Sequence, residues 1–261
     1  MGSNMTIRKI AVTGANGTIG VRLCADLAAD HALVRIDRED ADVCADIRDA
    51  EAMNAALRGC DAVVHLAGVV AVDAAWDDVY TTNIGGTYTV FEAARLNGVK
   101  HVVFASSNHA VGMNEVRNVP HIYEPGFGRV VGVEDPYRPD GLYGVWKAFG
   151  EVLGRYYSDA FGLNVACVRI GSITAADDPA DESVRASSGW LGLTDEQKFK
   201  RYAATWMSQR DFARLVRCIL ARDVPYAVVY GVGDNATRFW DLEAGRAIYG
   251  FWPQDGVKPN G

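Results

Sequence analysis

The chain has 261 residues, of which 49% are hydrophobic and 23% charged, a composition typical of a soluble globular protein with a sizeable core rather than of a disordered or fibrous one. Its 26 basic and 33 acidic residues give a net charge of −7 without any run of Lys and Arg, and no apolar run approaches the roughly 18 residues that cross a bilayer, which disfavours nucleic acid and membranes as partners. The five cysteines are widely spaced without a Cys-x-x-Cys pair, so we expect no disulfide framework and no metal site, but five buried thiols in a reducing cytoplasm.

Short β-branched runs alternate with amphipathic stretches through the first two-thirds of the chain, which predicts parallel strands joined by helical crossovers. The predicted strands cover residues 9–13, 32–37, 62–66, 101–105, 165–170 and 227–230. The first predicted helix carries the stripe Ile19, Leu23 and Leu27. The second follows Asp49 as a cap and stops before Gly59, and the third starts with Ile84, Tyr88 and Phe91 and ends at Asn97-Gly98. Two further helices are predicted over 211–221 and about 241–249. Because most strands are continuous apolar runs, we expect an α/β fold with a doubly wound parallel sheet covered on both faces.

Two long segments, residues 111–141 and 174–199, interrupt this alternation. The first contains four prolines and five glycines without a period, and the second is polar and rich in acids. Irregular segments of this length in a compact domain are usually lids or disordered. Both segments follow motifs with a candidate chemical role, so we favour lids.

The first predicted strand runs directly into a glycine-rich turn. The turn reads Thr13-Gly14-Ala15-Asn16-Gly17-Thr18-Ile19-Gly20, with the spacing Gly-x-x-Gly-x-x-Gly, and it opens a helix. Glycines so placed allow a tight turn, a close approach of the backbone to a pyrophosphate at the helix N-terminus, and close packing of helix on strand. The turn therefore predicts a Rossmann-type dinucleotide site, and the alternative is an ordinary glycine-rich turn between a strand and a helix.

The second predicted strand ends in Asp37, at the distance of about 20 residues from the turn that dinucleotide sites show. Its carboxylate could accept the ribose hydroxyls and would repel a 2′-phosphate, which favours NAD over NADP. Arg38 and Arg35 argue the other way, since an arginine beside the ribose can pair with that phosphate. Asp46 and Ile47 follow where a carboxylate and an apolar side chain could meet the adenine, although Asp46 could equally be a surface residue.

Two further motifs carry polar side chains suited to acid–base chemistry. Ser107 follows the fourth predicted strand within Ala-Ser-Ser-Asn-His, and the motif Tyr-Gly-Val-Trp-Lys places Tyr143 and Lys147 at i and i+4 of one helix. A tyrosine needs about 3 units of pKa lowering, or roughly 4 kcal/mol, to act as a base near pH 7, and a neighbouring ammonium provides it. Taken singly, Tyr143 could be a packing residue and Ser107 a cap.

Together with the glycine turn, these motifs resemble the extended short-chain dehydrogenase/reductases, which include NAD-dependent sugar epimerases and dehydratases. The resemblance implies that Tyr143 is the base beside Lys147 and that Ser107 holds the reacting hydroxyl. It also implies that Asn83, in Asn-Ile-Gly-Gly-Thr, relays the proton of the lysine through water. The implied NAD site consists of Gly14, Asn16, Gly17, Thr18, Ile19, Gly20, Asp37, Arg38, Asp46, Ile47, Leu66, Ala67, Gly68, Asn83, Tyr143, Lys147 and Ile170.

A closer resemblance, to the uronate dehydrogenases and related sugar-phosphate dehydrogenases, rests on four motifs: Phe-Ala-Ser-Ser-Asn-His at 104–109, Arg-Pro-Asp-Gly-Leu-Tyr-Gly at 138–144, Val-Arg-Ile-Gly-Ser at 168–172 and Thr-Trp-Met-Ser at 205–208. These enzymes oxidise the C1 hydroxyl of a pyranose to a lactone. The resemblance implies that Arg201 clamps an anionic C6 group, as in a uronate or a 6-phospho- or 6-sulfo-hexose. The other implied sugar contacts are Ser107, Asn108, His109, Tyr143 and Ser172. His109 could instead be a structural histidine, and Arg201 a surface charge.

Three departures from the uronate dehydrogenases concern the end of the pocket that would hold C6. Trp146 replaces a small residue before the lysine, Val70 stands in place of a polar substrate contact, and the segment 174–199 is longer. These departures leave the chemical identity of the C6 group undecided, whereas the predicted chemistry at C1 does not depend on them.

Two other functional classes stay open. An NAD-retaining sugar epimerase or dehydratase is disfavoured by Asn108-His109, where dehydratases carry an acidic pair, and by the short C-terminal portion; a non-catalytic NAD(P)-sensing regulator is disfavoured by the presence of Tyr143 and Lys147. We expect an NAD-binding unit over residues 5–170 and a small substrate-binding portion with a lid over 171–261 that shares its core. The resemblance also implies a homodimer through the helices that start near Asn83 and Leu142.

Overall fold

The structure is a computed structural model, and it describes residues 7–71, 73–182 and 191–258. Seven parallel strands form one sheet in the order β3-β2-β1-β4-β5-β6-β7. The strands are β1 (Lys9–Thr13), β2 (Ala32–Asp37), β3 (Val43–Cys44), β4 (Ala62–His65), β5 (His101–Ser107), β6 (Asn164–Ile170) and β7 (Tyr226–Gly231). The α-helices are α1 (Thr18–Leu27), α2 (Ala50–Ala56), α3 (Trp76–Asp78), α4 (Gly86–Leu96), α5 (Met113–Val116), α6 (Leu142–Phe161), α7 (Asp195–Thr205), α8 (Gln209–Leu220) and α9 (Glu243–Tyr249). The 3-10 helices η2 (Asn108–Val111) and η3 (His121–Tyr123) and the π-helical η1 (Val79–Gly85) complete the described elements.

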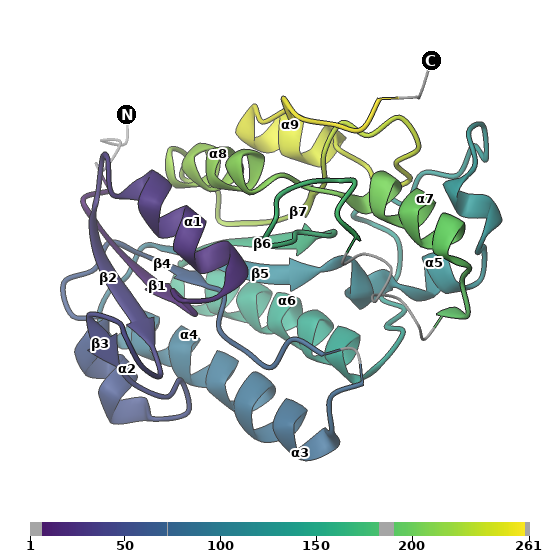
Figure 1. The fold of residues 1–261 in the computed structure, drawn as a ribbon. Coiled ribbons are helices and arrows are strands. Elements are labelled where there is room, and N and C mark those ends of the chain that lie inside the picture. The colour runs from purple at the N-terminus through teal and green to yellow at the C-terminus, as the bar shows by residue number, and fades with distance from the viewer. Residues whose placement is uncertain (1–6, 72, 183–190, 259–261) are drawn as a thin grey trace.

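Helices cover both faces of the sheet (Figure 1): α1, α8 and α9 lie on one face, and α2, α4 and α6 on the other. Neighbouring strand residues point to opposite faces, so that Val63 belongs to the core under α4 and α6 while Val64 belongs to the core under α1 and α8. This arrangement explains why the strands read as continuous apolar runs, and the expected Rossmann-type doubly wound sheet is confirmed.

The order of the chain reverses between β1 and β4, which are hydrogen-bonded neighbours although β2 and β3 lie between them in sequence. The connections that leave the carboxyl ends of these two strands therefore run to opposite sides and open a crevice between them. Segments from α5 and α7 gather at the same end of the molecule (Figure 1), near the ends of β5 and β6. The fold thus places the glycine turn, the β5 motif and α7 around one region.

The segment 111–141 is packed rather than a loose lid. Val111, Ile122, Tyr123 and Val131 are all 1% exposed or less and form a third core cluster with Trp240. The segment also contains the last residue of η2 and all of η3 and α5, and the main chain of Val131 pairs with Phe239 and Asp241. In this structure it is an integral part of the fold.

The predicted strands agree with the observed ones to within two residues at each end, while β3 and α7 were not predicted. The segment 174–199 runs into α7, which starts at Asp195 behind a capping box of Thr194 and Gln197, and residues 183–190 lie outside the described chain. Tyr88 is 52% exposed and so is not part of the core stripe on α4. The expectation of five buried thiols is wrong for Cys44, which is exposed, and for Cys218, which is half-buried.

β7 and α8 belong to the same sheet and core as the first 170 residues, and the proposed boundary at 170 coincides with the end of β6. That division stays a prediction. None of the described helices has both the length and the apolar character that a membrane span requires.

Candidate active site

A cleft of about 910 Å³ opens at the carboxyl ends of β1, β2, β4, β5 and β6. It is lined by all the residues expected at the dinucleotide except Asn83, and by Ser107. Asn108, His109, Ser172 and Arg201 do not line it. The sequence motifs from five separate strand ends therefore meet in one cleft, and four of the expected sugar contacts lie behind its wall.

The glycine turn leaves a helix N-terminus open toward the cleft. Gly14 has φ +72°, and a Cβ there would lie 2.8 Å from the Ala67 backbone nitrogen. A Cβ at Gly20 would lie 2.2 Å from the Gly14 carbonyl oxygen, so only glycine lets α1 pack so closely on the turn. Gly17 caps α1 without a side-chain hydrogen bond, so the first-turn N–H groups have no side-chain partner. These features fit the pyrophosphate of a dinucleotide.

Asp37 is held rigidly at the edge of the cleft. Its Oδ2 accepts the backbone N–H of Asn16 and its Oδ1 that of Arg38, each at 2.8 Å. Arg35, a candidate phosphate partner, instead donates to the Asn16 side chain at 2.6 Å and to the Asp40 carbonyl at 3.2 Å. Asp37 is therefore suited to bind a ribose, and the guanidinium of Arg35 beside it is hydrogen-bonded to Asn16 and Asp40.

The expected adenine contacts also line the cleft. Asp46 forms an ion pair with Arg48, with Nη2–Oδ2 at 2.7 Å, and these hydrogen bonds lower the pKa of its carboxyl. Ile47 is 7% exposed and packs so closely on Gly86 that a Cβ there would lie 2.5 Å from its Cδ1. Sequence reasoning missed Arg48, which lines the cleft as well.

Tyr143 and Lys147 lie together in the cleft, where α6 brings them beside the end of β5. The Lys147 Nζ lies 5.3 Å from the centroid of the Tyr143 ring and donates to the Ala105 carbonyl oxygen at 2.5 Å. Ser107 donates to the Asn108 side-chain oxygen at 3.1 Å, and its own Oγ accepts the His109 N–H at 3.3 Å. The structure thus brings three of the four residues with predicted catalytic roles to one place, and the roles themselves stay predictions.

The two titratable groups of this triad are perturbed in opposite directions. Burial raises the pKa of the Tyr143 hydroxyl above its ordinary value, and a hydrogen bond with Ser107 only partly opposes this. Burial also lowers the pKa of Lys147 well below its ordinary value, against the field of Glu151. Without further positive charge Tyr143 is therefore protonated at neutral pH, and a cationic cofactor ring would favour the phenolate.

Trp146 packs directly against Lys147 and does not line the cleft. Its ring centroid lies 3.5 Å from the Lys147 Nζ, and its indole N–H donates to the Thr87 hydroxyl at 2.8 Å. Gly68 makes room for it, because a Cβ there would lie 2.2 Å from the indole ring. The expectation that Trp146 reshapes the C6 end of the pocket is therefore not met, whereas Val70 does line the cleft.

A buried histidine connects this tryptophan to the glycine turn. The His65 Nε2 lies 3.2 Å from the same Thr87 hydroxyl, and Nδ1 lies 2.8 Å from the Thr13 hydroxyl at the end of β1. Burial, reinforced by Lys147, lowers the pKa of His65 to about 3. The imidazole is therefore neutral near pH 7 and can accept at one nitrogen while it donates at the other.

Asn83 is fully buried in the π-helical turn η1, and its side chain holds the main chain of Val69. The Val69 N–H donates to Oδ1 at 2.7 Å, and Nδ2 donates to the Val69 carbonyl at 3.1 Å. The Asn83 amide therefore holds the loop that follows β4. The proposed proton relay through water stays a prediction.

The remaining sugar contacts form a second layer behind Tyr143. The His109 ring lies 5.5 Å from the Tyr143 ring, and its Nδ1 lies 2.8 Å from Oδ2 of Asp140. Ser172 shares a hydrogen bond of 2.8 Å with Thr205 near the end of α7. Arg201, also on α7, forms an ion pair with Glu115, with Nε–Oε1 at 2.7 Å.

Asp140 and Glu115 are the residues of this layer that sequence reasoning missed. Glu115 and Arg201 lie 86 positions apart, and Asp140 and His109 lie 31 apart. Such pairs leave no periodic signal in one sequence.

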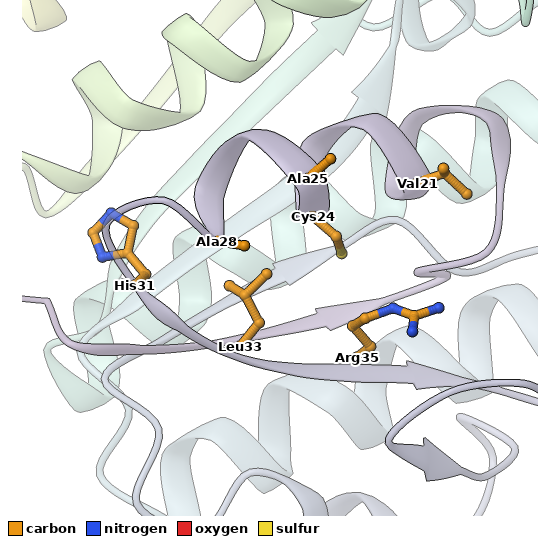
Figure 2. A pocket seen from close by; sticks show the side chains of 7 residues that line it. All are labelled: Val21, Cys24, Ala25, Ala28, His31, Leu33 and Arg35. Atoms are coloured by element: carbon orange, nitrogen blue, oxygen red, sulfur yellow. The ribbon is translucent and has the colours of Figure 1, made fainter.

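A second, shallower hollow lies between α1 and β2 (Figure 2). Its lining is mainly apolar, with Cys24, His31 and Arg35 as the polar members. His31 Nδ1 lies 3.1 Å from the Ile7 carbonyl, Arg35 is engaged with Asn16, and burial raises the pKa of the Cys24 thiol. These groups do not form a second reactive site.

Comparison with known proteins decides the family. A model described as "NAD dependent epimerase/dehydratase family" matches residues 10–225. The chain belongs to this family. It is 36% identical to the NAD-dependent glucose-6-phosphate dehydrogenase of Haloferax volcanii, over 94% of this chain and 93% of that protein. It is 38% identical to the L-arabinose 1-dehydrogenase (NAD(P)(+)) of the same organism, over 95% of this chain and 96% of that protein.

A solved structure of a family member agrees with the fold. A mutant of uronate dehydrogenase from Agrobacterium tumefaciens, complexed with NAD, is 33% identical and superposes with a TM-score of 0.77, covering 96% of this chain and 86% of that one. The predicted resemblance and the cofactor NAD are thereby confirmed, and the chain is an NAD-dependent dehydrogenase of the short-chain dehydrogenase/reductase superfamily.

Proposed function

We propose that this protein oxidises the C1 hydroxyl of a cyclic aldose to the lactone and transfers the hydride to NAD. The observation that carries the proposal is the position of Ser107, Tyr143 and Lys147 at one end of a cleft whose other end fits a dinucleotide. The names of the relatives support a sugar as the substrate, since they are dehydrogenases of glucose 6-phosphate, of L-arabinose at C1 and of uronates.

The oxidation removes a hydride and a proton from the sugar, which together are two electrons and two protons. The C1–H electron pair leaves as a hydride, the hydroxyl proton passes to the Tyr143 phenolate, and the C1–O bond becomes a carbonyl. NAD, when bound, supplies the hydride acceptor and a positive charge.

The residues of the chain prepare this proton transfer. Ser107 would hold the reacting oxygen by a hydrogen bond as its charge changes. Lys147, in its ammonium form beside the Tyr143 ring, favours the phenolate against the effect of burial.

The anionic C6 group stays a prediction. The names of two relatives favour it, because a uronate and a sugar 6-phosphate are anions at C6. L-Arabinose carries no such charge. The ion pair between Arg201 and Glu115 argues against it.

An assay with NAD and a panel of aldoses, uronates and 6-substituted hexoses tests the proposal. We expect reduced cofactor to accumulate with at least one sugar, and Tyr143→Phe to lower kcat by about 10²- to 10⁴-fold while NAD still binds. Tyr156→Phe, an exposed tyrosine on the same helix, serves as the matched control. Sugar turnover without free NADH would instead support the NAD-retaining epimerase or dehydratase, and tight NAD binding without any turnover would support the sensing regulator.

We also propose that the protein is a homodimer that pairs through α4 and α6. Both helices leave large apolar side chains in solvent, with Tyr88 52%, Val152 57% and Tyr156 56% exposed. The two helices pack on each other. A two-fold axis beside them would bury this face against its copy. A cytoplasmic location stays a prediction.

A further inference from the structure

A buried ion pair lies behind the catalytic tyrosine, between α7 and the segment that follows β5. Arg201 is 7% exposed and Glu115 only 1%. The guanidinium contacts the carboxylate through Nε–Oε1 at 2.7 Å and Nη2–Oε2 at 3.4 Å. The Tyr123 hydroxyl donates to the same Oε1 at 2.7 Å, and burial together with Glu115 raises the pKa of Tyr123, so this donor keeps its proton.

Short contacts connect this ion pair to the residues around Tyr143. Glu115 lies on α5, and its N–H donates to Gly112, against which the Asp140 carboxylate packs so closely that a Cβ would clash with Oδ2. Asp140 in turn contacts His109, whose ring stacks edge-on against that of Tyr143.

Arg201, the other member of the ion pair, is also connected to the site. Arg201 lies one turn before Thr205 on α7, and the Thr205 hydroxyl bonds Ser172 at 2.8 Å. Ser172 directly follows Gly171 at the rim of the cleft. The pair therefore lies one layer behind the rim of the cleft at Gly171.

The pair removes the positive charge that an anionic sugar would need. An arriving carboxylate must either stay apart from Arg201 or displace Glu115, which would then be a buried anion with its charge uncompensated. A second carboxylate, Asp140, lies in the same layer, and its Oδ1 is buried without a hydrogen-bond partner among the described residues. An unpaired acceptor of this kind favours a hydroxyl donor and repels an anion.

We propose that Glu115 is a specificity-determining residue: by holding Arg201, it makes this dehydrogenase select an uncharged aldose over the same sugar with a carboxylate or phosphate at C6. The proposal rests on the proposed C1 oxidation and names its substrate class.

The unmodified protein gives the first test. Glucose with glucuronate, and galactose with galacturonate, differ only in having a hydroxymethyl or a carboxylate at C6, and glucose 6-phosphate adds the phosphate. We expect kcat/KM with NAD to be at least about tenfold higher for the neutral member of at least one pair, as one unfavourable buried contact requires. A preference for the uronate or the 6-phosphate overturns the inference and leaves the C1 oxidation standing. Failure of every sugar to reduce NAD overturns the C1 oxidation as well.

Variants then assign the effect to Glu115. Glu115→Gln should raise the uronate-to-neutral ratio of kcat/KM by about tenfold or more, because it frees the guanidinium from its charged partner. Glu115→Asp keeps the charge and should leave the ratio near that of the unmodified protein. The double variant Glu115→Gln with Arg201→Met should lose the gain. Thermal melting and NAD binding report whether each variant is folded, and an unchanged ratio in folded Glu115→Gln overturns the assignment.

Discussion

Replacing Asp37 by Asn should shift the cofactor preference from NAD toward NADP. Two backbone amides fix the Asp37 carboxylate at the cleft edge, at 2.8 Å from Asn16 N and from Arg38 N. A 2′-phosphate on the adenosine ribose would meet this carboxylate directly. Asn has a single acceptor oxygen and so satisfies only one of the two amides, but both of these hydrogen bonds are exposed, so water can replace the lost one.

The magnitude follows from the charges at this edge. A phosphate carries about −1.5 to −2 charges, and two like unit charges about 4 Å apart repel by about 1 kcal/mol in water and about 4 kcal/mol near a protein surface. Removal of a half-buried carboxylate should therefore help NADP by about 2 kcal/mol. NAD also loses a charged hydrogen bond to its ribose, worth about 1.5–3 kcal/mol. Since these effects overlap, we expect the NADP-to-NAD ratio of kcat/KM to rise by about 30- to 1,000-fold.

The assay is the initial rate of cofactor reduction with NAD and with NADP, at a fixed concentration of a sugar that the protein oxidises. Asp42→Asn is the matched control, because Asp42 is a neighbouring carboxylate that accepts the Arg35 N–H at 2.9 Å and does not line the cleft. It should change the ratio by less than about twofold, as expected for an exposed charge outside the cleft that salt and water screen. A change of less than about threefold in Asp37→Asn, or equal changes in both variants, would refute the position of the ribose.

Three further predictions concern packing, pH and assembly. Gly68→Ala should lower the free energy of unfolding by about 1–3 kcal/mol and reduce activity, because its Cβ would lie 2.2 Å from the Trp146 ring that supports Lys147. His65→Gln should flatten the pH dependence of stability: with a folded pKa of about 3 against 6.5 unfolded, the unmodified protein should lose about 2 kcal/mol from this group between pH 7 and pH 5, since only the unfolded imidazole takes up the proton. Val152→Lys on α6 should convert the proposed dimer to a monomer in size-exclusion chromatography with light scattering.

Each of these variants has a matched control in the chain. Gly85→Ala adds a Cβ at 3.5 Å from the nearest neighbouring atom, an ordinary contact, and should not destabilise the protein. His121→Gln alters an exposed histidine and should keep the pH slope of the unmodified protein. Val130→Lys changes a side chain that is 62% exposed outside α4 and α6, and should leave the assembly unchanged. If a variant and its control behave alike, the corresponding prediction is wrong.

The features that a single sequence reveals here are those set by local spacing. The strands could be predicted because both faces of the sheet are covered, which turns each strand into an apolar run. The glycine turn and Asp37 follow from the geometry of one strand, one turn and one helix, and the structure places them in one cleft. The two-residue strand β3 is too short for any period to show.

Partners that meet only in three dimensions could not be predicted. Arg201 could be identified as a candidate sugar contact, but its charge is paired with Glu115, which lies 86 positions away. Trp146 could be seen as an unusual bulk beside Lys147, but its direction depends on Gly68 and Thr87. The type of each residue therefore predicts which interactions its side chain can make, whereas its contacts in the structure decide which of them it makes.

Helix α6 combines residues placed by local spacing with partners that are distant in sequence. Tyr143, Lys147 and Glu151 lie at i, i+4 and i+8, so one helix face carries all three. Glu151 is fully buried, and Arg169 from β6 contacts its carboxylate at 2.9 Å. This pairing offsets part of the charge of Glu151, so Glu151 weakens the positive field of a Lys147 ammonium at Tyr143 less than an unpaired carboxylate would.

The same carboxylate accepts a hydrogen bond from Ser106, the residue before Ser107 on β5. Glu151 therefore ties α6 to the strand end that carries Ser107, and it does so one helical turn from Lys147. In the proposed mechanism, this buried contact supports the relative position of Tyr143 and Ser107. Precise placement of this kind is what proton transfer requires, since the reacting groups must lie within hydrogen-bond reach of each other.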